Sequence, residues 1–317
     1  MRINEETMSV PAQFNSERNA PWNVLGTETV GKLNAADAIQ AAGLDWNVEL
    51  APLRASYNGE FLNVPRKHAV VRDSDSKVLG VVGDRYEVLQ NAEMFSFLDG
   101  IVDANDAHYE VAGHAKGGSV VWMMLKPNAN EIEINGDPCE AYLLAATSHD
   151  GTSSVIVKPI IERLWCANAL GWALKGTANT FRARHTASLG GKIDEARTAL
   201  DLTLTYQKEF EAYAKALADI ELTLSQEREL IGKLVLPGKT ESQEKRRETQ
   251  RSEILDAVHG PTIQAENRFN AWGFVQGVND YELWSQGRDK GRSEKQLMHA
   301  LRPSHGLTER ARQMIGA

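Results

Sequence analysis

Short segments that either alternate between apolar and polar residues or are continuously apolar recur along residues 46–157, and no other feature restricts the fold as strongly. They are WNVEL, FLNV, HAVVRD, VLGVVG, HYEVAGHA, SVVWMMLKP, EIEI, CEAYLLAATS and SSVIV. Alternation, as in WNVEL, puts the apolar side chains on one face of a strand, and short apolar runs bounded by turn residues suit buried strands, so each segment is predicted to be a β-strand. Asn135-Gly136 is the strongest local hairpin signal, and Lys116-Gly117-Gly118 predicts a second turn. This order of strands and turns predicts a largely antiparallel sheet.

Helical patterns interrupt the strands and then follow them. Asn34 is placed to cap the helix AADAIQAAG, and VLQNAEMFSFLDGIVD has apolar residues at helical spacing. Pro159 suits a helix start, so IIERLWCANALGWAL is predicted to be a helix that packs on the sheet. The chain is therefore expected to have an α+β fold: a largely antiparallel β-sheet with packed helices, in a β-β-β-α-like core, followed by a mainly α-helical C-terminal half.

After Gly190-Gly191 the composition shifts to residues that favour helices. An apolar seam at intervals of four and three residues predicts a long amphipathic helix through Tyr206, Phe210, Tyr213, Leu217 and Ile220. Ser225 is expected to cap QERELIGKLVL, and Thr240 with Gln243 to form a capping box for a very polar helix. Four regions result: a flexible N-terminal arm (1–20), an α+β core domain (21–190), a helical region (191–285) and a basic tail expected to be mobile (286–317).

The charge and hydropathy of the chain limit its functional classes. The net charge is −8 over 317 residues, and no apolar run is long enough to cross a bilayer. The polar first twenty residues do not resemble a signal peptide, so the expected location is the cytoplasm. Cys139 and Cys166 lie in apolar segments, which favours buried thiols over a disulfide. An acidic chain is a poor general binder of polyanions, so contact with DNA or RNA requires a focused basic patch.

Residues 163–193 contain no acidic side chain, which makes them the candidate for such a patch. The basic residues in this stretch are Arg163, Lys175, Arg182, Arg184 and Lys192, and His185 adds a further charge when protonated. Cations beside tryptophans are typical of surfaces that meet a nucleic-acid backbone. The alternative is that these cations only neutralise acidic helices nearby.

Known catalytic motifs are missing from the sequence. Gly238-Lys239-Thr240 resembles the end of a phosphate-binding loop, but the required glycine five positions earlier is replaced by Lys233. There is no dinucleotide fingerprint, GxSxG or HExxH motif. His149-Asp150 is a possible metal pair, but within Thr147–Gly151 it is better explained as a hairpin turn that bonds the local backbone. The sequence therefore requires no enzyme activity, cofactor or metal.

Several segments together resemble the phage/plasmid-like protein family, which is of unknown function and spread on bacterial mobile elements. They are PWNVLGT, AGLDWNVEL, VLGVVGDRYEVLQNAEMFSFLD, TSHDGTSSVIVKPIIERLWCANAL and RARHT, in the family's order over roughly residues 20–285. The expected order of strands and helices is also distantly similar to the core of single-strand annealing recombinases. That resemblance implies a homo-oligomeric ring that binds the DNA backbone in a basic groove without ATP.

The leading hypothesis from the sequence is a phage recombination protein that binds and anneals single-stranded DNA. The expected phosphate contacts are Lys158, Arg163, Lys175, Arg182, Arg184, His185 and Lys192, with help from Arg85 and Lys116. Trp165 and Trp172 are candidates for stacking on bases, with core packing as the alternative. A second hypothesis is a non-catalytic phage protein that binds a host replication or defence protein through its acidic helical half, residues 241–253. An enzyme with an unrecognised site is third.

Overall fold

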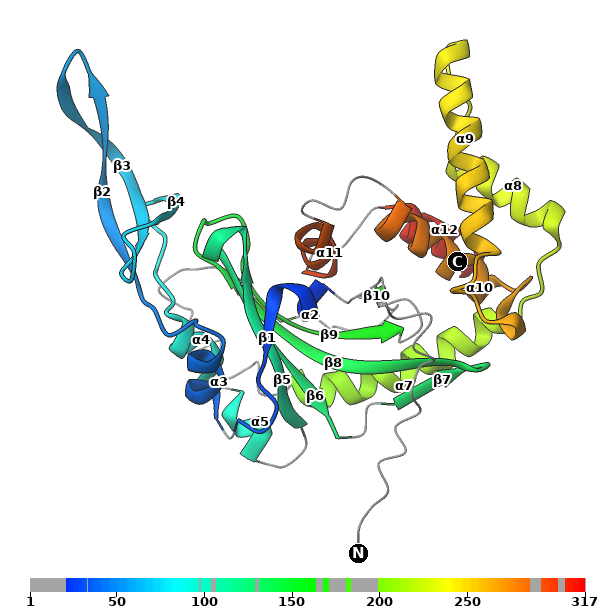
Figure 1. Ribbon diagram of the computed structural model, residues 1–317, viewed down its shortest axis with the longest axis horizontal. Coiled ribbons are helices and arrows are strands. Elements are labelled where there is room, and N and C mark those ends of the chain that lie inside the picture. The colour runs from blue at the N-terminus through cyan, green and yellow to red at the C-terminus, as the bar shows by residue number, and fades with distance from the viewer. Residues whose placement is uncertain are drawn as a thin grey trace, which may run out of the picture.

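The protein has an α+β fold, with antiparallel sheets in its N-terminal half and mostly helices in its C-terminal half (Figure 1). It is described from a computed structural model. The structure describes residues 21–32, 34–96, 98–103, 107–128, 131–163, 168–170, 181–183, 199–285, 292–301 and 306–316. The predicted fold class is confirmed. No helix within these ranges is long and apolar enough to span a membrane.

The large sheet runs in the order β1-β5-β6-β8-β9-β10, with β7 also paired to β8 and β11 to β9. All of these pairings are antiparallel. Asn135 and Gly136 have φ values of 47° and 76° in the turn between β7 and β8, as the hairpin signal predicts. The strands are β1 (Gly26–Glu28), β5 (Ala107–Ala115), β6 (Val120–Pro127), β7 (Glu131–Ile134), β8 (Asp137–Ser148), β9 (Val155–Arg163), β10 (Asn168–Leu170) and β11 (Phe181–Ala183).

A smaller sheet carries a long hairpin that projects from the body of the protein (Figure 1). It consists of β2 (Val48–Tyr57), β3 (Glu60–Arg72) and β4 (Val78–Gly83), an antiparallel meander as expected. FLNV and HAVVRD, predicted as separate strands, form the single strand β3, which continues through Pro65. Ser119 Oγ, at the start of β6, donates to the Leu79 carbonyl at 2.7 Å. Gly80 lies so close to Asp150 that a Cβ there would be 2.4 Å from the Asp150 Cα. These contacts fix the smaller sheet to one end of the large one.

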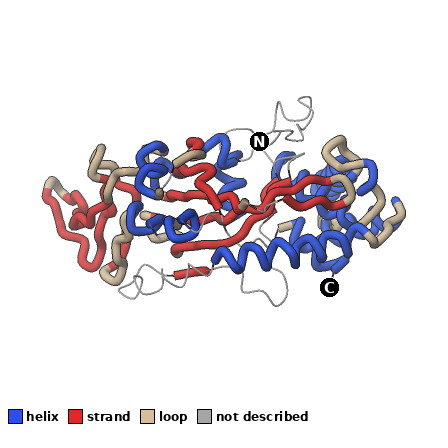
Figure 2. The backbone as a smooth tube through the Cα atoms, turned by 90° about the horizontal axis from the view of Figure 1, so that it is seen from below, coloured by secondary structure: helices blue, strands red, loops and turns tan. Residues whose placement is uncertain are grey.

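Helices cover both faces of the large sheet. On one face, Trp22 of α2 (Pro21–Leu25) and Leu297 of α11 (Arg292–Leu301) pack in the same cluster as Tyr142 and Leu144 of β8. On the other, β8 and β9 meet α3 (Ala35–Ala41) and α4 (Asn91–Ser96) at one end and α7 (Ala199–Ala218) at the other. Figure 2 shows α7 running along the strands. Among the described residues, α7 is the first helix after the strands of the large sheet and packs on β7, β8 and β9, in keeping with the expected β-β-β-α-like order.

The remaining helices form a cluster beyond α7. They are α8 (Leu224–Leu234), α9 (Glu241–Val258), α10 (Ala271–Asp280), a π-helix (Tyr281–Ser285) and α12 (Leu307–Gly316). The short helix α5 (Asp99–Asp103) is separate from this cluster and lies beside β5. Tyr206, Phe210 and Leu217 of α7 are buried against the helical cluster and Tyr213 is partly buried, which confirms the predicted seam up to Leu217. Ile220 lies after the end of α7 and is exposed, so that part of the prediction is wrong. Thr240 caps α9 by accepting from Gln243 N.

Three local predictions differ from the structure. The segment after Pro159 continues as strand β9 to Arg163 and is not a helix. Pro159 lies opposite Leu143 of β8. On the other edge of β9 it falls between the stretch paired with β11 and the stretch paired with β10, so no described strand stands opposite it there to require its missing N–H. Thr223, not Ser225, caps α8, through a full capping box with Gln226.

The third difference concerns the tail. Within residues 286–317, two helices, α11 and α12, pack on the body instead of a mobile segment. Leu297 and Leu301 are buried against the large sheet, and Leu307 and Ala311 against the helical cluster. In both helices the apolar residues recur three or four positions apart, which gives each helix one apolar face to pack on the body of the protein.

Candidate nucleic-acid interface

Arg163, predicted to contact phosphate, is instead a buried structural residue. Its side chain is 1% exposed, and its Nε lies 2.7 Å from Oδ2 of Asp137, which is fully buried. A terminal nitrogen of the same guanidinium donates to the Thr262 carbonyl at 3.1 Å, and Trp272 Nε1 donates to the same Asp137 oxygen at 2.9 Å. The pair therefore ties β8 and β9 to the helical cluster and is not available to DNA.

Lys158 is also buried, so the prediction that it contacts phosphate is wrong. Its Nζ donates to the Ala300 carbonyl of α11 at 2.7 Å. Burial lowers the pKa of Lys158 to about 8, and the charge of Arg182 acts in the same direction. Lys158 belongs to the contact between α11 and the sheet.

Three predicted contact residues remain on the surface, at the end of the large sheet where the smaller sheet is attached. Arg182 of β11 lies opposite Ile156, Lys116 is in the turn between β5 and β6, and Arg85 follows β4. All three are exposed. The other predicted residues, Lys175, Arg184, His185, Lys192, Trp165 and Trp172, lie outside the described residues.

The tip of the β2–β3 hairpin exposes aromatic side chains that sequence analysis did not select. Tyr57 is 65% exposed and Phe61 is 74% exposed. The turn between them is formed by Asn58 and Gly59, with φ values of 49° and 82°. Tyr57 pairs with Glu60 and Phe61 with Ser56, so the two rings lie on opposite faces of the ribbon. The signal was available as an Asn-Gly pair between aromatic residues.

Cations accompany these aromatics along the hairpin. Residues 53–67 contain Arg54, Arg66 and Lys67 but a single carboxylate, Glu60. Arg66 has the left-handed φ of 60° where the β2–β3 pairing is irregular, and it is 87% exposed although its Nε lies 3.2 Å from Asp84. Such a pair is weak because both partners are solvated. The distal hairpin is therefore a basic surface with aromatic side chains on both faces.

His149 and Asp150 lie in the bend between β8 and β9, and Asp150 bonds the local backbone there as predicted. Its Oδ1 accepts from Thr152 N at 2.9 Å. His149 instead points into the core, where its Nε2 lies 2.9 Å from Asn91 Oδ1 and its ring packs edge-on against Trp46. Among the described residues, no group of three or more His, Cys, Asp or Glu is arranged to hold a metal ion.

Two glutamates, Glu162 buried and Glu140 partly buried, lie side by side on the face of the sheet that α2 covers. Glu140 of β8 and Glu162 of β9 are direct cross-strand partners. Trp22 Nε1 donates to Glu162 at 3.1 Å, while Lys126 and Tyr142 donate to Glu140 at 3.0 and 2.5 Å. Burial, followed by the charge of Glu140, raises the pKa of Glu162 to about 8. A neutral Glu162 avoids repulsion across the strand pair, which accounts for the arrangement as part of the core.

The fold and this surface define a class: an α+β protein whose antiparallel sheet carries a projecting, basic hairpin with exposed aromatics. The chain belongs to the family described as Domain of unknown function (DUF932), whose model matches residues 78–303. The match begins at the first residue of β4, so β2 and β3 precede it. No curated protein and no solved structure matches the chain.

Proposed function

We propose that this protein binds single-stranded DNA and anneals complementary strands without ATP, as a recombination protein of a phage or related mobile element. The sequence segments that resemble the phage/plasmid-like family support the biological setting. The hairpin supports the activity, because proteins that bind single strands without sequence preference combine a cationic track with aromatic rings on which bases stack.

One observation carries the proposal: Tyr57 and Phe61 are exposed on opposite faces of a ribbon that also carries Arg54, Arg66 and Lys67. Exposed aromatic rings on a two-stranded projection add nothing to a core, and such a ribbon alone is only marginally stable. Stacking on a base gives each ring a partner and contributes about 1–3 kcal/mol. In this proposal the strand passes the hairpin and continues to Arg85, Lys116 and Arg182 at the end of the large sheet.

The test of the stacking surface is titration of a fluorescein-labelled oligo-dT with full-length protein. Tyr57→Ala combined with Phe61→Ala is expected to weaken binding about tenfold or more, since two stacking contacts are lost. The matched control is Leu62→Ala, which removes an exposed aliphatic side chain from the same strand and leaves affinity unchanged. Equal losses in both variants would show that the tip acts through general apolar contact and would overturn the stacking assignment.

The basic track has its own test, in the salt dependence of oligo-dT binding. Arg182→Gln with Arg184→Gln is expected to reduce the slope of log affinity against log salt by about one to two, because each phosphate contact on a single strand contributes about 0.7. A double variant that binds as tightly as the parent with an unchanged slope would exclude this track. Annealing is then measured by fluorescence quenching between complementary labelled strands without ATP.

A second candidate is the binding of a host replication or defence protein through the helical half. The observation in its favour is α9, whose N-terminal part projects from the body and is largely exposed (Figure 1). This part carries Glu241 and Glu248 beside Lys245 and Arg246. A defined protein partner whose binding is lost when these glutamates are changed to glutamine, together with no oligo-dT affinity, would replace the DNA-binding proposal.

A further inference from the structure

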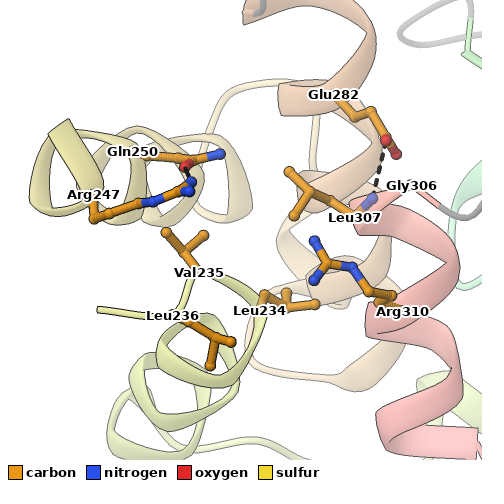
Figure 3. Close-up of a pocket in the computed structure, with 9 residues that line it drawn as sticks. All are labelled: Leu234, Val235, Leu236, Arg247, Gln250, Glu282, Gly306, Leu307 and Arg310. Carbon is orange, nitrogen blue, oxygen red and sulfur yellow. Dashed lines mark hydrogen bonds between the residues drawn. The ribbon is translucent and has the colours of Figure 1, made fainter. Parts of the chain in front are cut away.

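A pocket with an aliphatic floor lies at the other end of the molecule from the hairpin, between the C-terminal end of α8, α9, the π-helix and α12 (Figures 1 and 3). Its volume of about 360 Å³ is within the range of ligand pockets, about 300–1,000 Å³. The aliphatic lining residues are Leu234, Val235, Leu236 and Leu307, and the charged ones are Arg247, Arg310 and Glu282.

The walls of this pocket are held by hydrogen bonds. Arg251 Nε donates to the Val235 carbonyl at 3.0 Å and its terminal nitrogen lies 2.7 Å from Glu244, which fixes the segment after α8 against α9. On the opposite wall, Glu282 accepts from Leu307 N at 2.9 Å and from Thr308 N at 3.0 Å. Glu282 thereby caps the N-terminus of α12, where a negative charge is stabilised. The pocket is preformed.

The pocket has an excess of positive charge available to a ligand. Arg247 and Arg310 are exposed and reach it from α9 and α12 (Figure 3). Arg247 donates to the neutral Gln250 at 2.9 Å. The carboxylates nearby have other partners: Glu244 binds Arg251, Glu309 binds Arg312 and Glu282 caps α12. Two guanidinium groups beside an apolar floor suit a ligand that has a carboxylate next to an aliphatic side chain.

We propose that this pocket binds a segment of a partner protein in which an acidic residue is adjacent to an aliphatic one. The charge favours an acidic ligand, and the exposed Leu236, 66% accessible at the rim, gives the partner an apolar contact. A nucleotide is disfavoured because none of the described lining residues is aromatic, so a base has no ring on which to stack. The inference goes beyond the proposed DNA binding and does not depend on it.

The experiment is selection of displayed random peptides on the full-length protein, with counter-selection on an Arg247→Gln, Arg310→Gln variant. Both arginines are exposed on helices, so the variant is expected to fold, as checked by its melting temperature. Enriched peptides are expected to contain Asp or Glu next to Leu, Ile or Val. In fluorescence titration, each single arginine change weakens such a peptide about tenfold, as expected for loss of a charge-assisted hydrogen bond. Arg246→Gln, on the same helix but outside the pocket, leaves affinity unchanged.

Three outcomes would overturn the proposal. In the first, no peptide is enriched over the counter-selected variant. In the second, the Arg247→Gln, Arg310→Gln variant keeps its affinity for the peptides and loses its affinity for oligo-dT, which would assign the pocket to a DNA phosphate. In the third, sizing shows that the parent is an oligomer and the double variant a monomer, which would assign the pocket to a second copy of this chain.

Discussion

At the scale of single residues, burial separates cations that hold the fold from cations that are available to a ligand. Arg163 and Arg182 both lie in the stretch without acidic residues, yet Arg163 is paired with Asp137 in the core and Arg182 is exposed. The partner of Arg163 is 26 residues away in the sequence, on the neighbouring strand. The local charge pattern therefore identified a basic stretch, but it could not tell that Arg163 is buried in the core while Arg182 is exposed.

The Arg163–Asp137 pair leads to a stability prediction. Arg163→Met is expected to lower the free energy of unfolding by about 3–5 kcal/mol, because it leaves a buried carboxylate without its cation. Urea denaturation measures this change. The control is Lys215→Met, whose ion pair with Glu211 is solvated and whose loss is expected to cost under about 1 kcal/mol. A loss at Arg163 no larger than at Lys215 would contradict the structural role.

Glu162 leads to a prediction about pH. Its folded pKa of about 8 lies above its ordinary value of 4.5, so the folded state binds more protons between these values. Stability is therefore expected to fall as pH rises from about 5 to 8. Glu162→Gln keeps an acceptor for Trp22 and should flatten this slope in urea denaturation at a series of pH values. Glu133→Gln, on the exposed side of β7, is the control and should leave the slope unchanged. Equal slopes in the parent, the Glu162→Gln variant and the Glu133→Gln variant would contradict the raised pKa of Glu162.

At the scale of elements, tertiary packing overrides local preference in β9 and in α11. The residues after Pro159 are apolar without a clear period, which suits either a buried strand or a buried helix. Pairing with β8 along nearly its whole length makes β9 a central strand. The segment containing α11 is polar overall, but its few apolar residues share one face, and the sheet provides the surface that buries them.

The packing of α11 leads to a prediction at this scale. Leu297→Ala is expected to destabilise the protein by about 2–5 kcal/mol, because Leu297 is fully buried against the sheet. Lys295→Ala, on the exposed side of the same helix, is expected to change stability by less than about 0.5 kcal/mol. Thermal denaturation of both variants makes the comparison. Similar melting temperatures for the two would mean that α11 does not stabilise the sheet.

At the scale of the whole molecule, the hairpin and the cationic pocket lie at opposite ends, with the large sheet between them (Figure 1). The family match, residues 78–303, covers most of the large sheet and the pocket residues up to Glu282. The pocket residues Gly306, Leu307 and Arg310 lie after it, and β2 and β3 lie before it. The tip of the hairpin and the C-terminal wall of the pocket therefore both lie outside the residues that the family model matches.

This separation predicts that the two surfaces act independently. The Tyr57→Ala, Phe61→Ala variant is expected to keep its affinity for the selected peptides, and the Arg247→Gln, Arg310→Gln variant to keep its affinity for oligo-dT. Distant substitutions without shared partners usually have additive effects. Titrating both ligands against both variants and their combination measures the coupling. A combined effect that differs from the sum by more than about 0.5 kcal/mol would show that the two ends communicate.

The sequence by itself determined the fold class, most of the strands from β2 to β8, the Asn135-Gly136 turn, and the caps at Asn34 and Thr240, because these depend on neighbours within a few residues. Only the tertiary structure decided that Pro159 lies in a strand, that Lys158 and Arg163 are buried, and that α11 covers the sheet. It also brought Arg247 and Arg310 to one pocket from helices far apart in the chain. The physical reason is that burial and charge pairing depend on which distant segments meet, which local pattern does not specify.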